Sequence, residues 1–238
     1  MTRPVRAVPP ARALAWYVEA MRLWKRGPVA FVLLALVTLA LDLGLNVVPI
    51  AGVLLAQIAV PIAGCGLLYA SLAADRGGKP RLRDAIAVFG APFRAIATVV
   101  LAGLIVFAAE AATAYLVGGI DMLSPGERSE SILPGDVLAI HAAGIFASLP
   151  FTFVPFAALF DDLGTREAFA ASIEGFRRNV APLAVYAALS LALLLLGFAT
   201  YGLGLLLAVP WWAASSYAAW KDVFDVRGAN TPPPLPPD

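Results

Sequence analysis

The sequence predicts an all-α membrane protein, a polytopic bundle of six transmembrane helices in three hairpins with amphipathic helices on the cytoplasmic side. Of the 238 residues, 61% are hydrophobic and 14% are charged, against about 25% charged residues in an ordinary soluble domain. The mean hydropathy is +0.83, and a soluble chain of this length needs a more polar surface. These observations exclude a soluble globular enzyme, a disordered chain and a nucleic-acid-binding protein.

The first expected element is a basic amphipathic segment over residues 1–28. Its apolar side chains recur at helical spacing, and most of its cations lie elsewhere on the helical wheel; the apolar set is Leu14, Tyr17, Val18, Met21 and Trp24. Such a pattern is typical of a helix that lies on the cytoplasmic leaflet, with its cations near anionic headgroups. Residues 165–178 repeat it. The expected contacts with the lipid surface are Arg12, Arg22, Lys25, Arg26, Arg177 and Arg178. The alternative is a lead-in helix packed on the bundle.

The second expected element is a transmembrane domain over residues 29–221. A membrane helix needs about 20 mostly apolar residues, and neither Leu43–Ala74 nor Asn179–Trp220 contains a charged residue. The second of these stretches is too long for one crossing, so it must fold back. The expected spans are residues 29–47, 51–74, 94–117, 137–160, 182–199 and 204–221. Prolines fall inside several of them, where each removes a backbone donor and can kink the helix.

The distribution of cations predicts the orientation. With six spans, 16 of the 17 Lys and Arg residues lie on one side, and Arg128 lies on the other. Under the positive-inside rule both termini are cytoplasmic. The last expected element, residues 222–238, is a proline-rich cytoplasmic tail that is extended or disordered. It is expected to be a solvated end, and a recognition role is the alternative.

The chain is also expected to repeat a unit of one amphipathic stretch followed by two spans. Ala59-Val60-Pro61 opens a run that reaches Asp75, and Ala208-Val209-Pro210 opens a similar run that reaches Asp222. The three expected hairpins lie near residues 11–76, 81–162 and 165–222. Each ends with an acidic residue on the cytoplasmic side.

Few polar side chains lie inside the expected spans, and they are Asp42, Asn46, Gln57, Glu110 and His141. The rise per residue of an α-helix puts all of them in the outer half of the bilayer. An ionisable group there is costly and should face a partner or water. Asp42, Glu110 and His141 are therefore candidates for one polar cluster that shares a proton or a cation. The alternative is that these groups hydrogen-bond neighbouring helices or are hydrated near the interface.

Other chemistry has no support in the sequence. Cys65 is the only cysteine and His141 the only histidine, which excludes an intrachain disulfide and the usual zinc or haem sites. Neither a phosphate-binding loop nor a nucleophile elbow is present. We therefore expect no enzymatic activity, no catalytic residue, no cofactor and no metal.

Several runs of residues resemble a known family. They are Trp16 with Arg22–Pro28, then Asp75-Arg76-Gly77, then Ser172 with Phe176–Asn179, and Tyr217–Phe224. Together they resemble a family of uncharacterised proteobacterial inner-membrane proteins, and distantly the membrane domain of some glycerophosphodiester phosphodiesterases. The resemblance implies the bacterial inner membrane and a six-span bundle, and it carries no catalytic residue.

Two functions follow as expectations. The sparse polar groups and small loops favour a non-catalytic scaffold or accessory protein of the membrane. Its partners would be the lipid bilayer, anionic lipid headgroups and other inner-membrane proteins, with no nucleic acid. The alternative is a small proton- or cation-coupled transporter or permease that uses the region of Asp42, Glu110 and His141.

Overall fold

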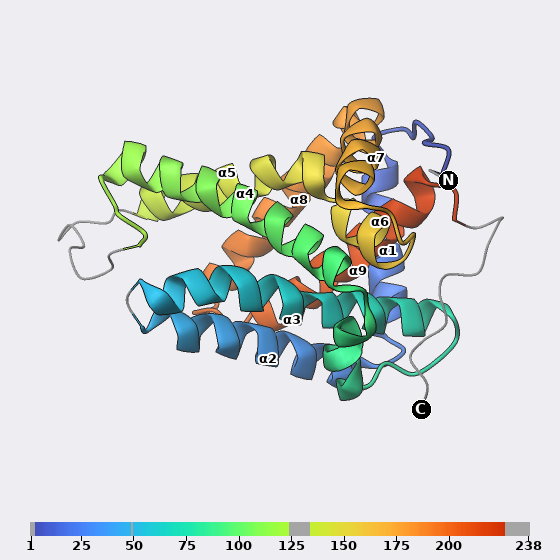
Figure 1. The fold of residues 1–238 in the computed structure, drawn as a ribbon, viewed down its shortest axis with the longest axis horizontal. Helices are drawn as coiled ribbons and strands as arrows, with labels where there is room; N and C mark the ends of the chain where they lie inside the picture. The colour runs from blue at the N-terminus through green and yellow to red at the C-terminus, as the bar shows by residue number, and fades with distance from the viewer. Residues whose placement is uncertain (1–2, 49, 124–133, 227–238) are drawn as a thin grey trace.

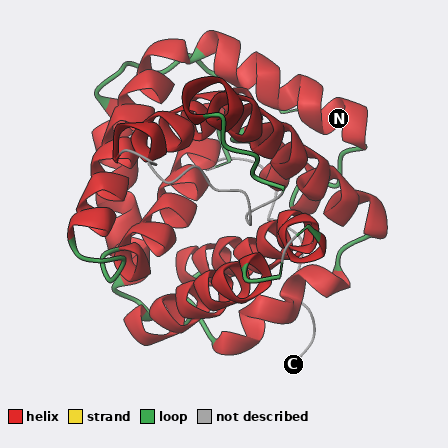
Figure 2. Cartoon of the chain, turned by 90° about the vertical axis from the view of Figure 1, so that its left-hand side faces the viewer, coloured by secondary structure: helices red, strands yellow, loops and turns green. Residues whose placement is uncertain are grey.

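The computed structural model describes residues 3–48, 50–123 and 134–226, and this part of the chain is helical without a strand (Figure 2). The proline-rich tail from residue 227 and most of the loop that holds Arg128 lie outside the described residues. The described elements are α1 (Arg12–Trp24), α2 (Pro28–Asn46), α3 (Ala51–Asp75), η1 (Leu82–Gly90), α4 (Phe93–Gly118), α5 (Pro134–Ser148), η3 (Leu149–Phe151), α6 (Val154–Leu159), α7 (Thr165–Arg178), α8 (Val180–Ala199) and α9 (Leu205–Val223).

The elements follow one another in three sets, each with a shorter segment before a longer pair. The sets are α1 with α2 and α3, η1 with α4 and the α5–α6 segment, and α7 with α8 and α9. Within each set the two long members contact each other. Figure 1 shows α1 and α7 running across the direction of α2, α3 and α4. The chain order is thus a short segment followed by two longer ones, three times; the arrangement of three membrane hairpins stays a prediction.

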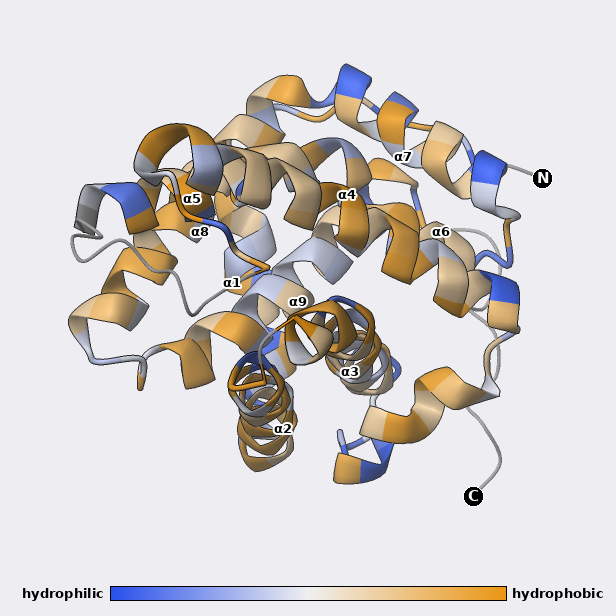
Figure 3. Ribbon diagram, turned by 60° about the vertical axis from the view of Figure 1, so that its left-hand side comes forward, coloured by the Kyte–Doolittle hydropathy of each residue, from blue (hydrophilic) through white to orange (hydrophobic). Residues whose placement is uncertain are grey.

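Four helices are long and apolar enough to cross a membrane, and they are α2, α3, α4 and α8. They coincide with the first, second, third and fifth expected spans, with ends that differ by one or two residues. Figure 3 shows apolar residues along most of α2 and α3. These helices are compatible with a membrane-embedded protein.

The fourth expected span, residues 137–160, is not one helix. The α-helix α5 ends at Ser148, η3 contains Pro150, and α6 begins at Val154 immediately before Pro155. Proline has no backbone N–H and its ring clashes with the preceding turn, so two prolines five residues apart interrupt the helical ladder. The expected span is therefore divided among three short helical segments, and its crossing of the membrane stays a prediction.

The sixth expected span corresponds to α9, which is 19 residues long. It is not among the four apolar helices because its second half carries polar side chains; these include Ser215, Ser216, Tyr217, Lys221 and Asp222. Helix length and composition therefore identify four of the six expected spans.

The largest apolar core lies at one end of the bundle, where α1, α6, α7 and α9 meet the end of α3. We call this the basic end, because the cations of α1, η1 and α7 lie there. Trp16, Phe153, Phe156, Tyr217 and Trp220 are among its fully buried side chains. The turns between α2 and α3 and between α8 and α9 lie at the opposite end (Figure 1).

One face of α1 packs on this core. Ala13, Trp16, Ala20 and Leu23 are buried against the bundle, chiefly against α9. This face corresponds to the lead-in alternative, because it contacts protein. On the other face, Leu14 and Val18 are 56% and 71% exposed, which leaves an apolar surface that lipid can cover.

Candidate solute-binding cavity

The structure places Glu110 and His141 each within electrostatic range of Asp42 at the opposite end. The charge of Asp42 on α2 acts on both Glu110 of α4 and His141 of α5. Asn46 joins this group, because its amide donates to the Asp42 carboxylate at 2.9 Å. In the described part of the chain no hydrogen bond links Gln57 of α3 to the others, although it lies at the same end.

The Glu110 side chain packs directly against α5. A Cβ atom added to Gly144 would overlap the Glu110 carboxylate, so the absent side chain of this glycine makes room for it. His141 lies one turn away on α5, where its ring meets Phe198 of α8 with centroids 5.4 Å apart. Glu110 and His141 are thus positioned by α4, α5 and α8 together.

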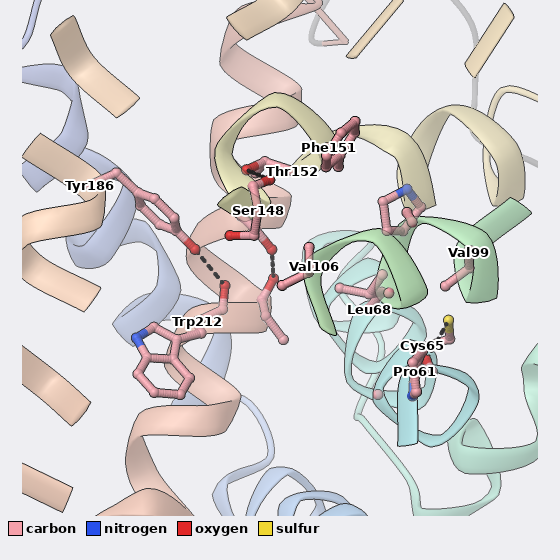
Figure 4. Close-up of a pocket in the computed structure, with 16 residues that line it drawn as sticks. Pro61, Cys65, Leu68, Val99, Val106, Ser148, Phe151, Thr152, Tyr186 and Trp212 are labelled. Atoms are coloured by element: carbon pink, nitrogen blue, oxygen red, sulfur yellow. Dashed lines mark hydrogen bonds between the residues drawn. The ribbon is translucent and has the colours of Figure 1, made fainter. Parts of the chain in front are cut away.

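Below this polar group lies a cavity of about 340 Å³. Residues of α3, α4, the α5–α6 segment, α8 and α9 line it, and these elements contact one another in turn around it. Figure 4 shows Tyr186 and Trp212 on one side of the cavity, across from Val99 and Cys65. The cavity therefore occupies the centre of a ring of helices.

The interior of the cavity is apolar although it contains hydroxyl and thiol groups. Ser148, Thr152 and Ser216 donate to carbonyls of their own segment at 2.7, 3.2 and 2.9 Å. The Cys65 thiol donates to the Pro61 carbonyl at 3.2 Å, and the Tyr186 hydroxyl donates to the Trp212 carbonyl at 3.4 Å. Because these donors are already engaged, the surface offered to an occupant is mostly carbon.

The polar residues continue the stripes of side chains that line the cavity. On α4 the lining residues Val99, Gly103 and Val106 are followed at the same spacing by Glu110. On α3 Gln57 precedes Pro61 by four residues, which is about one turn or 6 Å. On α5 His141 lies two turns before Ser148. Gln57, Glu110 and His141 therefore lie beyond the lining residues, toward the end opposite the basic end, and we call these three residues the polar mouth.

Toward the basic end the space is filled by aromatic rings, which we call the aromatic cluster; its members are Tyr69, Phe156, Phe160, Tyr217 and Trp220. All five are buried. The rings of Phe156 and Trp220 stack with centroids 5.4 Å apart, and those of Tyr69 and Phe160 meet edge to face at 5.3 Å. These five rings form a closely packed aromatic layer toward the basic end.

Beyond the aromatic cluster, ion pairs connect the first and third sets of helices. Lys221 of α9 lies 2.5 Å from Asp75 at the end of α3. In return, Asp222 of α9 accepts from Arg12 at 2.7 Å and from the Trp16 indole at 2.9 Å. The hydrogen bond to Asp222 raises the pKa of Arg12 above its ordinary value. The sequence predicts that Asp75 and Asp222 end repeated units. It does not show that each of them pairs with a cation of the other unit.

The segment before α1 is fastened to the same end. The amide of Asn179 donates to the Arg6 carbonyl at 2.9 Å and accepts from the Val8 backbone at 2.9 Å. Arg3 pairs with Asp161 at 2.7 Å. Burial raises the pKa of Asp161 above its ordinary value, in spite of the neighbouring Arg3.

The cations predicted to contact lipid have different surroundings. Arg12, Arg22 and Arg178 pair with carboxylates of the chain, namely Asp222, Glu19 and Glu174. Arg26 donates to the Ala74 carbonyl at 2.7 Å. Lys25 and Arg177 are exposed. The lipid contacts themselves stay a prediction.

The described residues contain no group of three or more His, Cys, Asp or Glu side chains that could hold a metal ion. No family model, curated protein or solved structure matches the chain. The resemblance to inner-membrane proteins therefore stays a prediction, and the cavity has to be interpreted from its own chemistry.

Proposed function

We propose that the chain is a six-span inner-membrane permease whose cavity binds a small amphipathic solute. In this proposal the α5–α6 segment and α9 cross the membrane together with the four apolar helices. The basic end faces the cytoplasm, because the positive-inside rule places Lys and Arg there. The polar mouth then faces the outer side of the membrane.

The observation that carries the proposal is the cavity of about 340 Å³ at the centre of the helix ring. An open, mostly apolar pocket of this size is large enough for a small amphipathic solute. Ligand sites of this kind are mostly apolar and contain a few placed polar groups. Asp42, Glu110 and His141 are such groups, and two carboxyl groups favour a cationic or hydrogen-bond-donating head.

The proposed direction of solute entry rests on the residues at the two ends of the cavity, which are polar at one end and aromatic at the other. A solute would approach from the polar mouth, where hydration of its head can be exchanged for contacts with Glu110 and Asp42. Its apolar body would occupy the space beside Gly64 and Val106. Passage to the cytoplasm would require the aromatic cluster to open, as in other transporters that bind a solute near the middle of the bilayer.

The proposal is tested by filling the cavity. Gly64 lines the cavity, and a Cβ atom there meets nothing within 4 Å, so Gly64→Leu should occupy the space without displacing the backbone. Gly44→Leu is the matched control, because Gly44 lies on the exposed face of α2 and its Cβ also meets nothing within 4 Å. The probe is radiolabelled tetraphenylphosphonium, an apolar cation, with the full chain in lipid nanodiscs and empty nanodiscs as the baseline.

We expect saturable binding above the baseline, a loss of at least tenfold in affinity for Gly64→Leu, and no change for Gly44→Leu. Charge displacement on a solid-supported membrane under a pH gradient then tests transport, and Glu110→Gln should reduce it. Binding no greater than in empty nanodiscs, or equal binding by both leucine variants, would refute the proposal. The prediction of a non-catalytic scaffold would then be preferred.

A further inference from the structure

The nine-residue segment η1, between α3 and α4, exposes an unusual amount of apolar surface. Leu82, Ile86 and Phe89 are 50%, 65% and 67% exposed, and Phe93 at the start of α4 is 83% exposed. The other side of the segment, with Ala87 and Val88, is buried. Large exposed apolar patches mark surfaces that contact a membrane or another protein.

This apolar face is held in a fixed orientation. A Cβ atom at Gly66 of α3 would lie 2.8 Å from the Ala85 Cα atom, so the backbones of α3 and η1 are in close contact. At the start of η1 the buried Asp84 carboxylate accepts from the Arg81 backbone at 2.9 Å. The exposed side chains are therefore directed outward by packing on the inner side.

Along the stretch of chain that carries this face the exposed charges are basic, while the exposed Asp162 pairs with Arg94, next to Phe93, at 2.6 Å. Between Asp75 and Glu110 the only acidic residue is Asp84, and it is buried. Lys79 and Arg81 are exposed on the same segment. Figure 1 shows the segment that joins α3 to α4 lying across these helices at the basic end. An apolar face flanked by cations at this position is complementary to the boundary between acyl chains and anionic headgroups.

We propose that η1 is an anionic-phospholipid contact that lies in the plane of the membrane surface. Acyl chains cover Leu82, Ile86, Phe89 and Phe93, and the phosphates of the headgroups pair with Lys79 and Arg81. From the sequence, lipid contact was expected for residues 1–28 and 165–178, and η1 was not among the expected contacts. The inference rests on the membrane placement in the proposed function, but not on the solute cavity.

Local lipid contact is measured with a fluorophore on single cysteines. In a Cys65→Ala background, bimane is attached at Ile86→Cys, at Phe89→Cys and, as control, at Arg166→Cys, which replaces an exposed cation of α7 at the same end. The full chain is reconstituted with brominated phosphatidylcholine or brominated phosphatidylglycerol. We expect strong quenching at positions 86 and 89 and weak quenching at position 166. Quenching at 86 and 89 no stronger than at 166 would overturn the proposal.

The headgroup contact is tested by removing its cations. For the label at position 89, quenching should be stronger by phosphatidylglycerol than by phosphatidylcholine. Lys79→Gln with Arg81→Gln should lower this preference by about fivefold per cation, while quenching by phosphatidylcholine persists. Arg166→Gln is the matched control and should leave the preference unchanged. A preference that survives the double substitution would overturn the headgroup assignment. Tetraphenylphosphonium binding of the same variants separates this outcome from a failure of the proposed cavity.

Discussion

The ion pair between Asp75 and Lys221 connects the first and last sets of helices, and its removal gives a sharp test of the packing at the basic end. Lys221 Nζ lies 2.5 Å from Asp75 Oδ2, and the two side chains are only 13% and 17% exposed. The Tyr217 hydroxyl donates to the same carboxylate at 3.1 Å. Asp75→Ala therefore leaves an ammonium group and a hydroxyl with little access to water.

The magnitude follows from these contacts. A hydrogen bond to a charged group contributes about 1.5–3 kcal/mol and a neutral one about 1 kcal/mol. Breaking a fully buried pair costs about 3–5 kcal/mol. Since this pair retains some exposure, we expect Asp75→Ala to lower the free energy of unfolding by about 3 kcal/mol. Lys221→Met added to it should cost little more, so the coupling energy should be about 2 kcal/mol.

The assay is a double-mutant cycle by reversible unfolding in mixed micelles, followed by circular dichroism. The matched control is Arg6 with Asp225, which are 2.8 Å apart but 56% and 48% exposed. Such exposed pairs couple by at most about 1 kcal/mol. A coupling energy for Asp75 and Lys221 no larger than that of Arg6 and Asp225 would refute the reasoning. It would mean that water screens the two ion pairs to the same extent.

Four further predictions follow. Burial raises the pKa of Asp161 in the folded state, so its contribution to stability is present at low pH and is lost as the pH rises through that pKa. Asp161→Asn, whose amide oxygen can still accept from Arg3, should flatten this pH dependence of the free energy of unfolding, measured by unfolding at a series of pH values. Gly144→Ala should displace the Glu110 carboxylate and weaken tetraphenylphosphonium binding as much as Glu110→Gln does. Asp42→Asn and Glu110→Gln should be non-additive in thermal stability by about 0.5–3 kcal/mol, whereas additive effects would show that the two carboxyl groups act separately. A reporter enzyme that works only in the cytoplasm should be active when it is fused to the C-terminus. Activity of a reporter that works only in the periplasm would contradict the proposed orientation.

From the sequence alone one can predict an all-α protein with apolar helices long enough to cross a membrane, and a common height for its polar residues; the structure confirms the first of these. The long uncharged stretches predict apolar helices because backbone groups in hydrocarbon must be bonded within the segment. Four expected spans recur as α2, α3, α4 and α8. Spacing along a helix converts directly to height, so Asp42, Glu110 and His141 could be assigned to one level.

The tertiary structure decided which helices are neighbours. Lipid-facing and core-facing side chains are both apolar in such helices, and the sequence therefore carries little information on which face packs inward. That Glu110 fits against Gly144 depends on the contact between α4 and α5 within one set, and that Lys221 pairs with Asp75 at a distance of 146 residues depends on contacts between different sets. The cavity also depends on tertiary contacts, because residues from five parts of the chain line it.

Two local features also needed the structure. The prolines at 150 and 155 indicated a kink, but only the packing of α6 against α4 and α7 shows that the chain divides into separate helices there. The apolar positions of η1 were visible in the sequence, but their exposure depends on the close contact between Gly66 and Ala85. A short segment has no intrinsic orientation, and the backbone that it packs against determines which side chains face outward.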